Sequence, residues 1–457
     1  MIRSVLIANR GEIACRVIRA CRALGLRTIA VYSEADANAL HKELADVAVA
    51  IGPAPAVQSY LVAEKVLAAG REHGADAVHP GYGFLSENSA FARAAQAAGL
   101  VWIGPDPQTI DAMGDKEQAR RVAQASGVPV LPGSGCLDPE APETWLAQAA
   151  AVGFPLLVKA VGGGGGIGMK RVDAMPALQS TVESAQTLAA KAFGRRDVYL
   201  ERYVERARHV EIQVFGDGAG NAVHLFEREC SVQRRFQKII EESPAPGLSA
   251  AVLARMADAA VALASAQRYA GAGTVEFVVD ARTDEFFFLE MNTRIQVEHG
   301  VTEMVTGIDL VQRQIQQAAG IAEPLAQRDI RRHGAAIECR LYAENPAKQF
   351  LPSPGRLTTL RLPAPHAHLR IDTGVREGDT VTPHYDPMIA KLIAHGPTRT
   401  AALQCMDAAL REVRIDGIAH NAGFLRAVLA HEDFAAGRID TGFVERERAA
   451  LLGMVAA

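Results

Sequence analysis

The sequence predicts a multidomain protein that combines an α/β region with α+β regions. The chain has 457 residues, which is more than one ordinary hydrophobic core accommodates. Its first part alternates short strand patterns with helical patterns, whereas two later parts combine neighbouring strands with separate helices. Alternation is typical of a parallel sheet, and grouped strands are typical of α+β domains. We therefore expect about two to four domains.

The first region, about 110 residues long, is predicted to form a Rossmann-like α/β domain. Strands separated by helices of this length imply a parallel sheet with right-handed connections. The turn after the first strand reads Ala8-Asn9-Arg10-Gly11-Glu12-Ile13 and lacks GxGxxG, so NAD binding is not expected. The expected elements are strands at 4–8, 28–32, 75–79 and 101–104 and a helix at 11–24.

The second region carries a run of glycines between two strand patterns. Residues 156–160 precede Gly162-Gly163-Gly164-Gly165-Gly166-Ile167-Gly168-Met169, and Lys170-Arg171-Val172 follows. Such a run lets a ligand reach backbone N–H groups and can close over phosphates. A flexible linker is the alternative, but the flanking strands favour a hairpin loop, and no GK[ST] opens a helix as in a P-loop. Upstream we expect a helix at 116–126 and a Pro/Gly-rich linker at 131–142.

The third region, from about His333, follows a crossing linker at 321–333. The chain as a whole shows no repeat of 20 to 50 residues and no low-complexity segment beyond the glycines. The expected elements of the third region are strands at 335–341, 357–362 and 391–394 and helices at 401–413 and 421–429.

Polar residues stand at every second position in the run from Glu290 to Glu298. An extended strand points alternate side chains to opposite faces, so one strand would present acids, amides and a cation to one cleft. A half-buried edge strand with a solvated polar face gives the same alternation, and the run alone leaves both interpretations open. The residues on the polar face are Glu290, Asn292, Arg294, Gln296 and Glu298.

A hairpin just upstream favours the cleft. Residues 273–279 are rich in β-forming side chains, and 286–289 are apolar after a polar stretch, which is typical of two antiparallel strands. In a symmetric register Glu276 lies opposite, or nearly opposite, Glu290. Facing carboxylates are destabilising unless a cation compensates them. The oxygen ligands Glu276, Glu290 and Asn292 suit Mg²⁺ or Mn²⁺ rather than zinc.

Composition argues against several classes of function. The net charge is −4, so no surface for nucleic acid or an anionic membrane is expected. No apolar run approaches the roughly 18 to 20 residues of a transmembrane helix, and the chain starts like a buried strand rather than a signal peptide. The six cysteines form no CxxC pair, which predicts reduced thiols. We expect a cytoplasmic protein.

Three lysines of the second region, Lys116, Lys159 and Lys238, lie near strands, a strand end or a helix start. Each alone is typical of a solvated surface. Together with a glycine loop and a metal site they would neutralise a triphosphate, whose transfer depends on positioning and charge.

The polar, cationic segment that ends in Lys238 is open to two interpretations. It is either a basic surface loop or, with Arg294 and Gln296, a binding site for a small oxyanion. Glu298 is then a candidate base, and Arg340, on a strand of the third region, a candidate donor to a developing enolate. The residues alone predict ATP-dependent, metal-assisted activation of a small acid.

The sequence resembles the biotin carboxylase family, the ATP-grasp component of acyl-CoA and pyruvate carboxylases. The similarity covers almost the whole chain, and its motifs are long. The segments that carry it are the glycine run, 7–14, 79–88, 113–116, 208–214, 290–298 and 350–355.

The resemblance implies three domains. These are a pre-ATP-grasp domain at 1–113, an ATP-grasp domain at 114–330 with a glycine-rich lid at about 131–204, and a C-terminal domain at 331–446. The implied cofactors are ATP and Mg²⁺ or Mn²⁺, and the implied substrate is biotin on a carrier protein.

The resemblance also implies a reaction in two stages. Glu298 deprotonates bicarbonate, which attacks the γ-phosphate of ATP to form carboxyphosphate. Its breakdown yields CO₂ and a phosphate that deprotonates biotin N1, while Arg340 stabilises the biotin enolate. The implied bicarbonate and biotin residues are Tyr82, Gly83, Lys238, Arg294, Gln296, Val297, Glu298 and Arg340. The implied nucleotide residues are Lys116, Lys159, Gly164, Gly165, Gly166, Met169, Glu201, Arg202, Tyr203, Val204, His209, Gln233, Phe236 and Leu289.

Three positions depart from the family pattern. Ile167 stands where Arg is usual and Phe236 where His is usual, and losing one charge-assisted hydrogen bond could weaken ATP binding by about 1.5 to 3 kcal/mol. Gly300, where Pro is usual, is a milder change in backbone stiffness.

Two alternatives remain at this stage. One is another bicarbonate-using ATP-grasp ligase related to carbamoyl phosphate synthetase, and the other is a non-catalytic scaffolding subunit, supported by Ile167 and Phe236. The resemblance implies a homodimer that works with a biotin carboxyl carrier protein and a carboxyltransferase. No Met-Lys-Met biotinylation motif follows the third region, so we expect the biotin on a separate protein.

Overall fold

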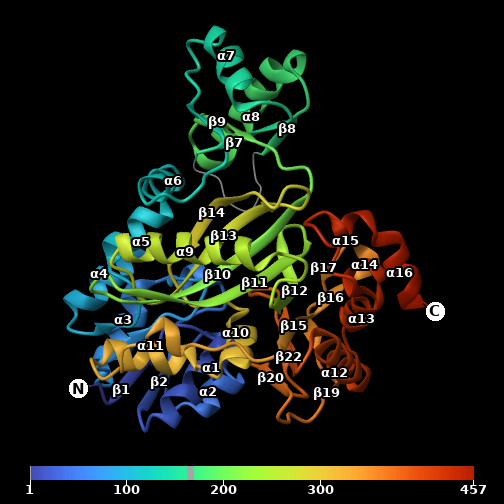
Figure 1. Cartoon of the computed structure of the whole chain (residues 1–457). Helices are drawn as coiled ribbons and strands as arrows, with labels where there is room; N and C mark the ends of the chain where they lie inside the picture. Colours follow the sequence, from blue (N-terminus) through green and yellow to red (C-terminus); the bar gives the residue numbers. More distant parts are fainter. Residues whose placement is uncertain (1, 162–168, 457) are drawn as a thin grey trace.

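The computed structural model describes residues 2–161 and 169–456. Its N-terminal region is built on a five-stranded parallel sheet in the order β3-β2-β1-β4-β5 (Figure 1). β1 is fully buried and apolar after Ser4, as expected for a central parallel strand. The strands are β1 (Ser4–Ile7), β2 (Arg27–Tyr32), β3 (Val47–Ala50), β4 (Ala77–His79) and β5 (Val101–Trp102). The helices are α1 (Gly11–Ala23), α2 (Leu40–Leu44), α3 (Ala63–Glu72), α4 (Ser89–Ala97) and α5 (Pro107–Gly114).

One antiparallel sheet of eight strands joins the second and third regions, in the order β14-β13-β10-β11-β12-β15-β22-β20. The contact between β12 and β15 connects the two regions directly, so residues far apart in sequence share one sheet. The strands are β10 (Ala207–Asp217), β11 (Ala222–Arg234), β12 (Gln237–Ser243), β13 (Ala270–Asp280), β14 (Phe286–Asn292), β15 (Ala335–Tyr342), β20 (Leu369–Thr373) and β22 (Met388–Gly396). The helices of the second region beside this sheet are α6 (Lys116–Ala125), α9 (Ala250–Ala266), α10 (His299–Thr306) and α11 (Leu310–Ala318).

A separate four-stranded sheet, which we call the lid sheet, stands apart from the body at the top of Figure 1. It has the order β6-β9-β7-β8, and the predicted hairpin is present because Val158 pairs with Lys170. The linker predicted at 131–142 is partly wrong, since Gly133–Cys136 forms an edge strand against β9. Its elements are β6 (Gly133–Cys136), β7 (Leu156–Ala160), β8 (Lys170–Val172), β9 (Val198–Arg202), α7 (Glu143–Val152) and α8 (Leu178–Phe193).

The C-terminal region packs helices against the far end of the large sheet, and its core includes Leu341, Leu392 and Phe424. The helices are α12 (Arg399–Glu412), α13 (Ala422–Ala430), α14 (Glu432–Ala435), α15 (Phe443–Arg446) and α16 (Arg448–Ala456). Short strands complete it: β16 (Glu344–Asn345), β17 (Leu351–Pro352), β18 (Gly355–Arg356), β19 (Thr359–Arg361), β21 (Thr380–Val381) and β23 (Arg414–Asp416).

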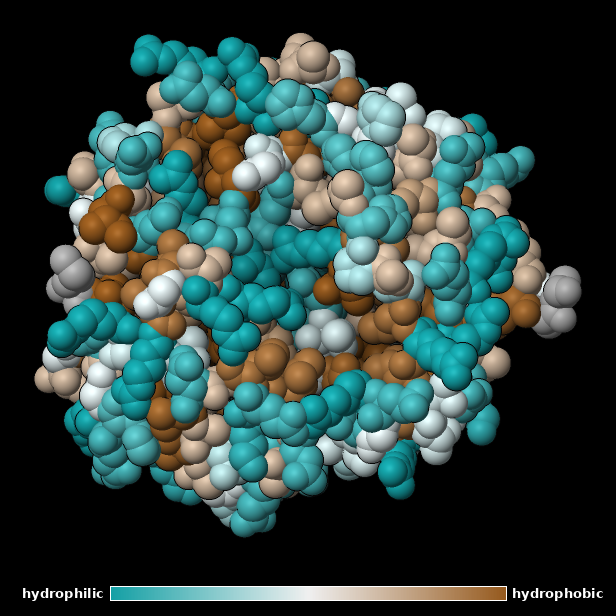
Figure 2. Space-filling model, turned by 90° about the horizontal axis from the view of Figure 1, so that it is seen from below, coloured by the Kyte–Doolittle hydropathy of each residue, from teal (hydrophilic) through white to brown (hydrophobic). Residues whose placement is uncertain are grey.

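The surface mixes polar and apolar residues, as the composition of the chain indicates. The face in Figure 2 shows several separate hydrophobic patches among polar residues. Within residues 2–161 and 169–456, no helix combines the length and hydrophobicity needed to cross a bilayer. All six cysteines are free thiols, as predicted.

One sequence prediction about the large sheet is wrong, and one of the two interpretations of the segment before Lys238 is excluded. The polar run from Glu290 is extended only to Asn292, where β14 ends, and the chain then turns through irregular backbone into α10. The segment before Lys238 is no surface loop, because β11 continues to Arg234 and a two-residue turn leads into β12. Arg235 and Phe236 form that turn with φ of 47° and 66°, the backbone that a tight hairpin requires.

Candidate active site

A cavity of about 1390 Å³ lies between the N-terminal region, the large sheet, the lid sheet and the C-terminal region. Every predicted site residue that the structure describes lines it. Gly164, Gly165 and Gly166, like Ile167, lie outside the described residues. The lining set comprises Tyr82, Gly83, Lys116, Lys159, Met169, Glu201, Arg202, Tyr203, Val204, His209, Gln233, Phe236, Lys238, Glu276, Leu289, Glu290, Asn292, Arg294, Gln296, Val297, Glu298 and Arg340.

The predicted facing pair of carboxylates is present, because Glu276 pairs directly with Glu290 across β13 and β14. Burial raises the pKa of Glu290 above its usual range, and the charge of Glu276 raises it further. Asn292 Nδ2 donates to Glu276 Oε1 over 2.9 Å. Two repelling carboxylates beside an amide are an oxygen donor set that fits a hard divalent cation such as Mg²⁺.

The residues after β14 still face the cavity, although no strand holds them there. Arg294 donates to Asn292 Oδ1 over 2.8 Å and to Gln296 Oε1 over 2.9 Å. Gln296 Nε2 donates to Glu276 Oε1 over 2.9 Å, and Arg294 Nε to Glu87 Oε2 over 2.8 Å. Side-chain hydrogen bonds thus replace the predicted alternation of an extended strand.

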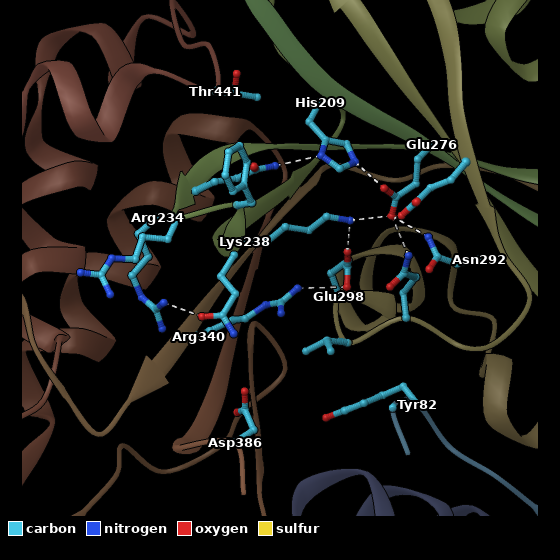
Figure 3. A pocket seen from close by; sticks show the side chains of 18 of the residues that line it. Tyr82, His209, Arg234, Lys238, Glu276, Asn292, Glu298, Arg340, Asp386 and Thr441 are labelled. Atoms are coloured by element: carbon cyan, nitrogen blue, oxygen red, sulfur yellow. Dashed lines mark hydrogen bonds and ion pairs between the residues drawn. The ribbon is translucent and has the colours of Figure 1, made fainter. Parts of the chain in front are cut away.

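Lys238 lies at the middle of a group that we call the charged centre, made of Lys238, Glu211, Glu276, Glu298 and Arg340. Figure 3 labels all of them except Glu211. The Lys238 Nζ is 2.6 Å from Glu211 Oε2, 2.9 Å from Glu276 Oε1 and 2.7 Å from Glu298 Oε1. Burial lowers the pKa of Lys238, but these three carboxylates raise it well above its usual range. The ammonium is therefore permanently charged at neutral pH.

Glu298 is held between two cations. Its Oε2 lies 3.1 Å from Arg340 Nη2, opposite the Lys238 contact. Burial raises the pKa of Glu298, but Lys238, Arg340 and then Arg228 lower it more, so that the pKa ends below its usual range. Glu298 is thus ionised and able to accept a proton once an incoming anion engages its cations.

Further polar residues line the cavity between the charged centre and the lid sheet. His209 Nε2 lies 2.7 Å from Glu276 Oε2, and its Nδ1 lies 2.8 Å from Gln233 Nε2. Burial lowers the pKa of His209, but Glu276 raises it above its usual value. Farther out, Lys159 on β7 forms an ion pair with Glu201 on β9. Phe236, at the hairpin tip, is 68% exposed.

Sequence reasoning missed several buried ionisable groups behind the cavity wall. Arg228, fully buried, contacts Glu211, whose alternation with His209 and Gln213 along β10 was a usable signal. The other missed groups lie on strands whose sequence pattern is typical of an apolar core. They are Glu241, which pairs with Arg340, and Lys391, which donates to the Val297 carbonyl over 2.7 Å and lies 3.3 Å from Glu12.

Three family models match the chain in succession. They are the N-terminal domain of biotin carboxylase at residues 1–110, the ATP-binding domain of the carbamoyl-phosphate synthase L chain at 115–326, and the C-terminal domain of biotin carboxylase at 338–446. The middle model bears the name of the alternative ligase, but both flanking models are of biotin carboxylase.

Relatives and solved structures extend this finding. Biotin carboxylase 1 of Bacillus subtilis is 47% identical, over 97% of this chain and 98% of its own length. The methylcrotonoyl-CoA carboxylase alpha subunit of Dictyostelium discoideum is 49% identical over 99% of this chain, which spans 64% of that subunit's length. A biotin carboxylase from Campylobacter jejuni, in complex with β,γ-ATP, has a TM-score of 0.92 at 43% identity, covering 98% of this chain and 99% of its own. The biotin carboxylase domain dimer of Hydrogenobacter thermophilus 2-oxoglutarate carboxylase, with MgADP and bicarbonate, has 0.92 at 42%, covering 99% of each. The resemblance predicted from the motifs is confirmed: the chain belongs to the biotin carboxylase family.

Proposed function

We propose that this chain catalyses the ATP- and bicarbonate-dependent carboxylation of biotin. The observation that carries the proposal is the position of Glu298 between Lys238 and Arg340, 2.7 Å and 3.1 Å away. One carboxylate between two cations on a cavity wall supplies a base together with the charges that receive an anion.

The first stage activates bicarbonate. Bicarbonate binds Lys238, Arg294, Gln296 and the Val297 backbone, and Glu298 takes its proton. The resulting dianion attacks the γ-phosphate of ATP, with ADP leaving and carboxyphosphate forming. Support comes from the small exposure of the cations Lys238 and Arg294, 12% and 18%, because a low local dielectric strengthens their attraction for a small anion.

The nucleotide binds on the lid side of the cavity. Lys159, Glu201, His209 and Gln233 contact it, and Lys116 approaches from α6. Glu276, Glu290 and Asn292 hold Mg²⁺ or Mn²⁺, which when bound neutralises phosphate oxygens during transfer. The pKa of Glu290, raised by burial and then by the charge of Glu276, supports this assignment, since a bound cation would favour the ionised carboxylate against both effects.

The second stage takes place at the Tyr82 and Gly83 side. Carboxyphosphate breaks down to CO₂ and phosphate, phosphate removes the N1 proton of biotin, and Arg340 stabilises the enolate that attacks CO₂. We propose that the biotin is attached to a carrier protein, that a carboxyltransferase completes an acyl-CoA or related carboxylase, and that the chain is a cytoplasmic homodimer. The relatives that are alpha chains of such carboxylases support the complex.

The test measures phosphate release from ATP with Mg²⁺, with and without bicarbonate and free biotin. We expect release that requires bicarbonate and rises with biotin. Glu298→Gln should lower the bicarbonate-dependent rate by about a hundredfold or more, and Arg340→Ala should remove the biotin stimulation. Arg328→Ala is the control, since that side chain is 87% exposed and outside the cavity. No stimulation by biotin or by a carrier would contradict the proposal.

A further inference from the structure

Two buried carboxylates lie behind Arg340 that the proposed reaction does not use. Glu241 on β12 and Glu338 on β15 pair directly across the two strands, and both are fully buried. Glu338 and Arg340 are two residues apart on one strand, so all three side chains point to the same face. The pair therefore lies next to the guanidinium that the second stage uses.

The two carboxylates differ in their contacts. Glu241 Oε1 forms an ion pair with Arg340 Nη2, the same nitrogen that bonds Glu298. Neither carboxylate accepts a hydrogen bond in the described part of the chain, so the ion pair with Arg340 is what distinguishes Glu241 from Glu338. α10 covers Glu338 closely because Gly300 has no side chain, and a β-carbon there would lie 2.9 Å from Glu338 Oε2.

Nη2 of Arg340 thus contacts two carboxylates, that of Glu298, which takes part in the proposed reaction, and that of Glu241, which does not. In the second stage Arg340 has to leave Glu298 and turn toward the biotin carbonyl. A guanidinium with Glu298 as its sole carboxylate would stay on Glu298, because leaving a buried ion pair is costly. A second carboxylate behind it keeps the charge compensated during the movement.

We propose that Glu241 is a positioning residue that holds Arg340 ready to move from Glu298 to biotin, with Glu338 as its buried neighbour. The inference rests on the proposed function and adds a residue to its second stage. It predicts that the charge of Glu241, and not merely its volume, is required.

The protonation of the pair supports this division of roles. Burial raises the pKa of Glu338 well above its usual range, and Lys391 offsets only part of the effect. Burial also raises the pKa of Glu241, but Arg340 holds it to about 7. Facing carboxylates do not both ionise readily, so Glu338 keeps its proton while Glu241 ionises near neutral pH.

Other groups around Glu241 set its charge as well. Burial lowers the pKa of His299, at the start of α10, well below its usual range, so this ring is neutral. Burial raises the pKa of the Cys230 and Cys339 thiols well above their usual range, so they are neutral too. The ionised groups that face the pair are Lys238 on β12, Arg340 on β15, Lys391 on β22 and Glu298 before α10.

The experiment compares wild type and Glu241→Gln in biotin-stimulated phosphate release from pH 5.5 to 8.5. Only ionised Glu241 compensates Arg340, so the ratio of the two rates should rise from near one below pH 6 to about tenfold at pH 8. The KM for ATP should stay unchanged, and Glu241→Asp should recover part of the rate at pH 8.

Glu338→Gln is the matched control on the same strand pair, since it replaces a group that is already neutral. It should keep the rate and the pH profile of wild type. A rate ratio that is constant with pH, or full activity of Glu241→Gln at pH 8, would overturn the inference. Absence of biotin stimulation in wild type would instead count against the proposed function.

Discussion

The two ends of the cavity are built differently. In the charged centre one ammonium, that of Lys238, contacts three carboxylates, and Glu298 is 1% exposed. At the lid end Lys159 contacts the single carboxylate of Glu201, which is 12% exposed, while the two lysines differ little, at 16% for Lys159 and 12% for Lys238. The positive charge of Lys238 is compensated by three carboxylates of the protein itself. Lys159 has the single carboxylate of Glu201 beside it and can still compensate the charge of a phosphate.

The difference follows from where the residues come from. Four members of the charged centre lie on strands of one large sheet, so backbone pairing fixes those side chains, and the fifth, Glu298, directly precedes α10. The four strand residues are Glu211, Lys238, Glu276 and Arg340. Lys159 and Glu201 belong to the lid sheet, which is a separate sheet of four strands. Changes at the centre should therefore affect both folding and catalysis, and changes at the lid end mainly nucleotide binding.

The largest effect is expected for Lys238→Met. It leaves Glu211, Glu276 and Glu298 without their common cation, and breaking a buried ion pair costs about 3 to 5 kcal/mol. We expect a lower thermal midpoint and no measurable bicarbonate-dependent phosphate release. Lys191→Met, at an exposed position of α8, is the control. A variant as stable as wild type would mean that the centre does not depend on this cation.

Lys159→Met tests the opposite end. Losing one charge-assisted hydrogen bond to a phosphate costs about 1.5 to 3 kcal/mol, so the KM for ATP should rise by about tenfold or more with little change in thermal midpoint. Lys170→Met is the matched control, because Lys170 lies on the adjacent lid strand and binds Ser184 instead of lining the cavity. An unchanged KM in Lys159→Met would contradict the assignment.

The same contrast decides what the sequence could predict. The pairing of Glu276 with Glu290 was predictable because a short hairpin constrains register. The position of Glu298 was predictable only as a member of the polar run, and for the wrong reason, since side-chain hydrogen bonds and not a strand bring it to the cavity. Glu241 and Lys391 were not predictable, because in strands that are buried on both faces an acid or a lysine has no periodic signature.

The lid sheet shows a second limit. β6 has the sequence Gly133-Ser134-Gly135-Cys136, whose residues predict a turn or linker. Pairing with β9 overrides this local preference, and such pairing is decided by contacts distant in sequence.

A smaller effect, with two opposite signs, is expected from pH within the centre. The folded pKa of Glu298 is depressed, so its contribution to stability is present above its unfolded pKa of about 4.3 and is lost as pH falls. Glu298→Gln should therefore show a shallower loss of urea midpoint between pH 6 and 4. Burial raises the folded pKa of Glu241 to about 7, so folding favours its protonated form. Glu241→Gln should gain stability relative to wild type as pH rises from 4 to 7. Equal slopes in all three proteins would contradict both assignments.

The smallest effect is expected for Phe236→His at the hairpin tip. The ring is 68% exposed on the cavity wall, so replacing it loses little packing, and the imidazole adds a donor that the phosphate side of the cavity can use. One neutral hydrogen bond is worth about 0.5 to 1.5 kcal/mol, so the KM for ATP should fall by about two- to tenfold. Histidine is also enriched in the left-handed backbone region that Phe236 occupies at φ 66°, where bulky residues are unusual, so the thermal midpoint should not drop. An unchanged KM would mean that the site already compensates for the phenylalanine at this turn between β11 and β12.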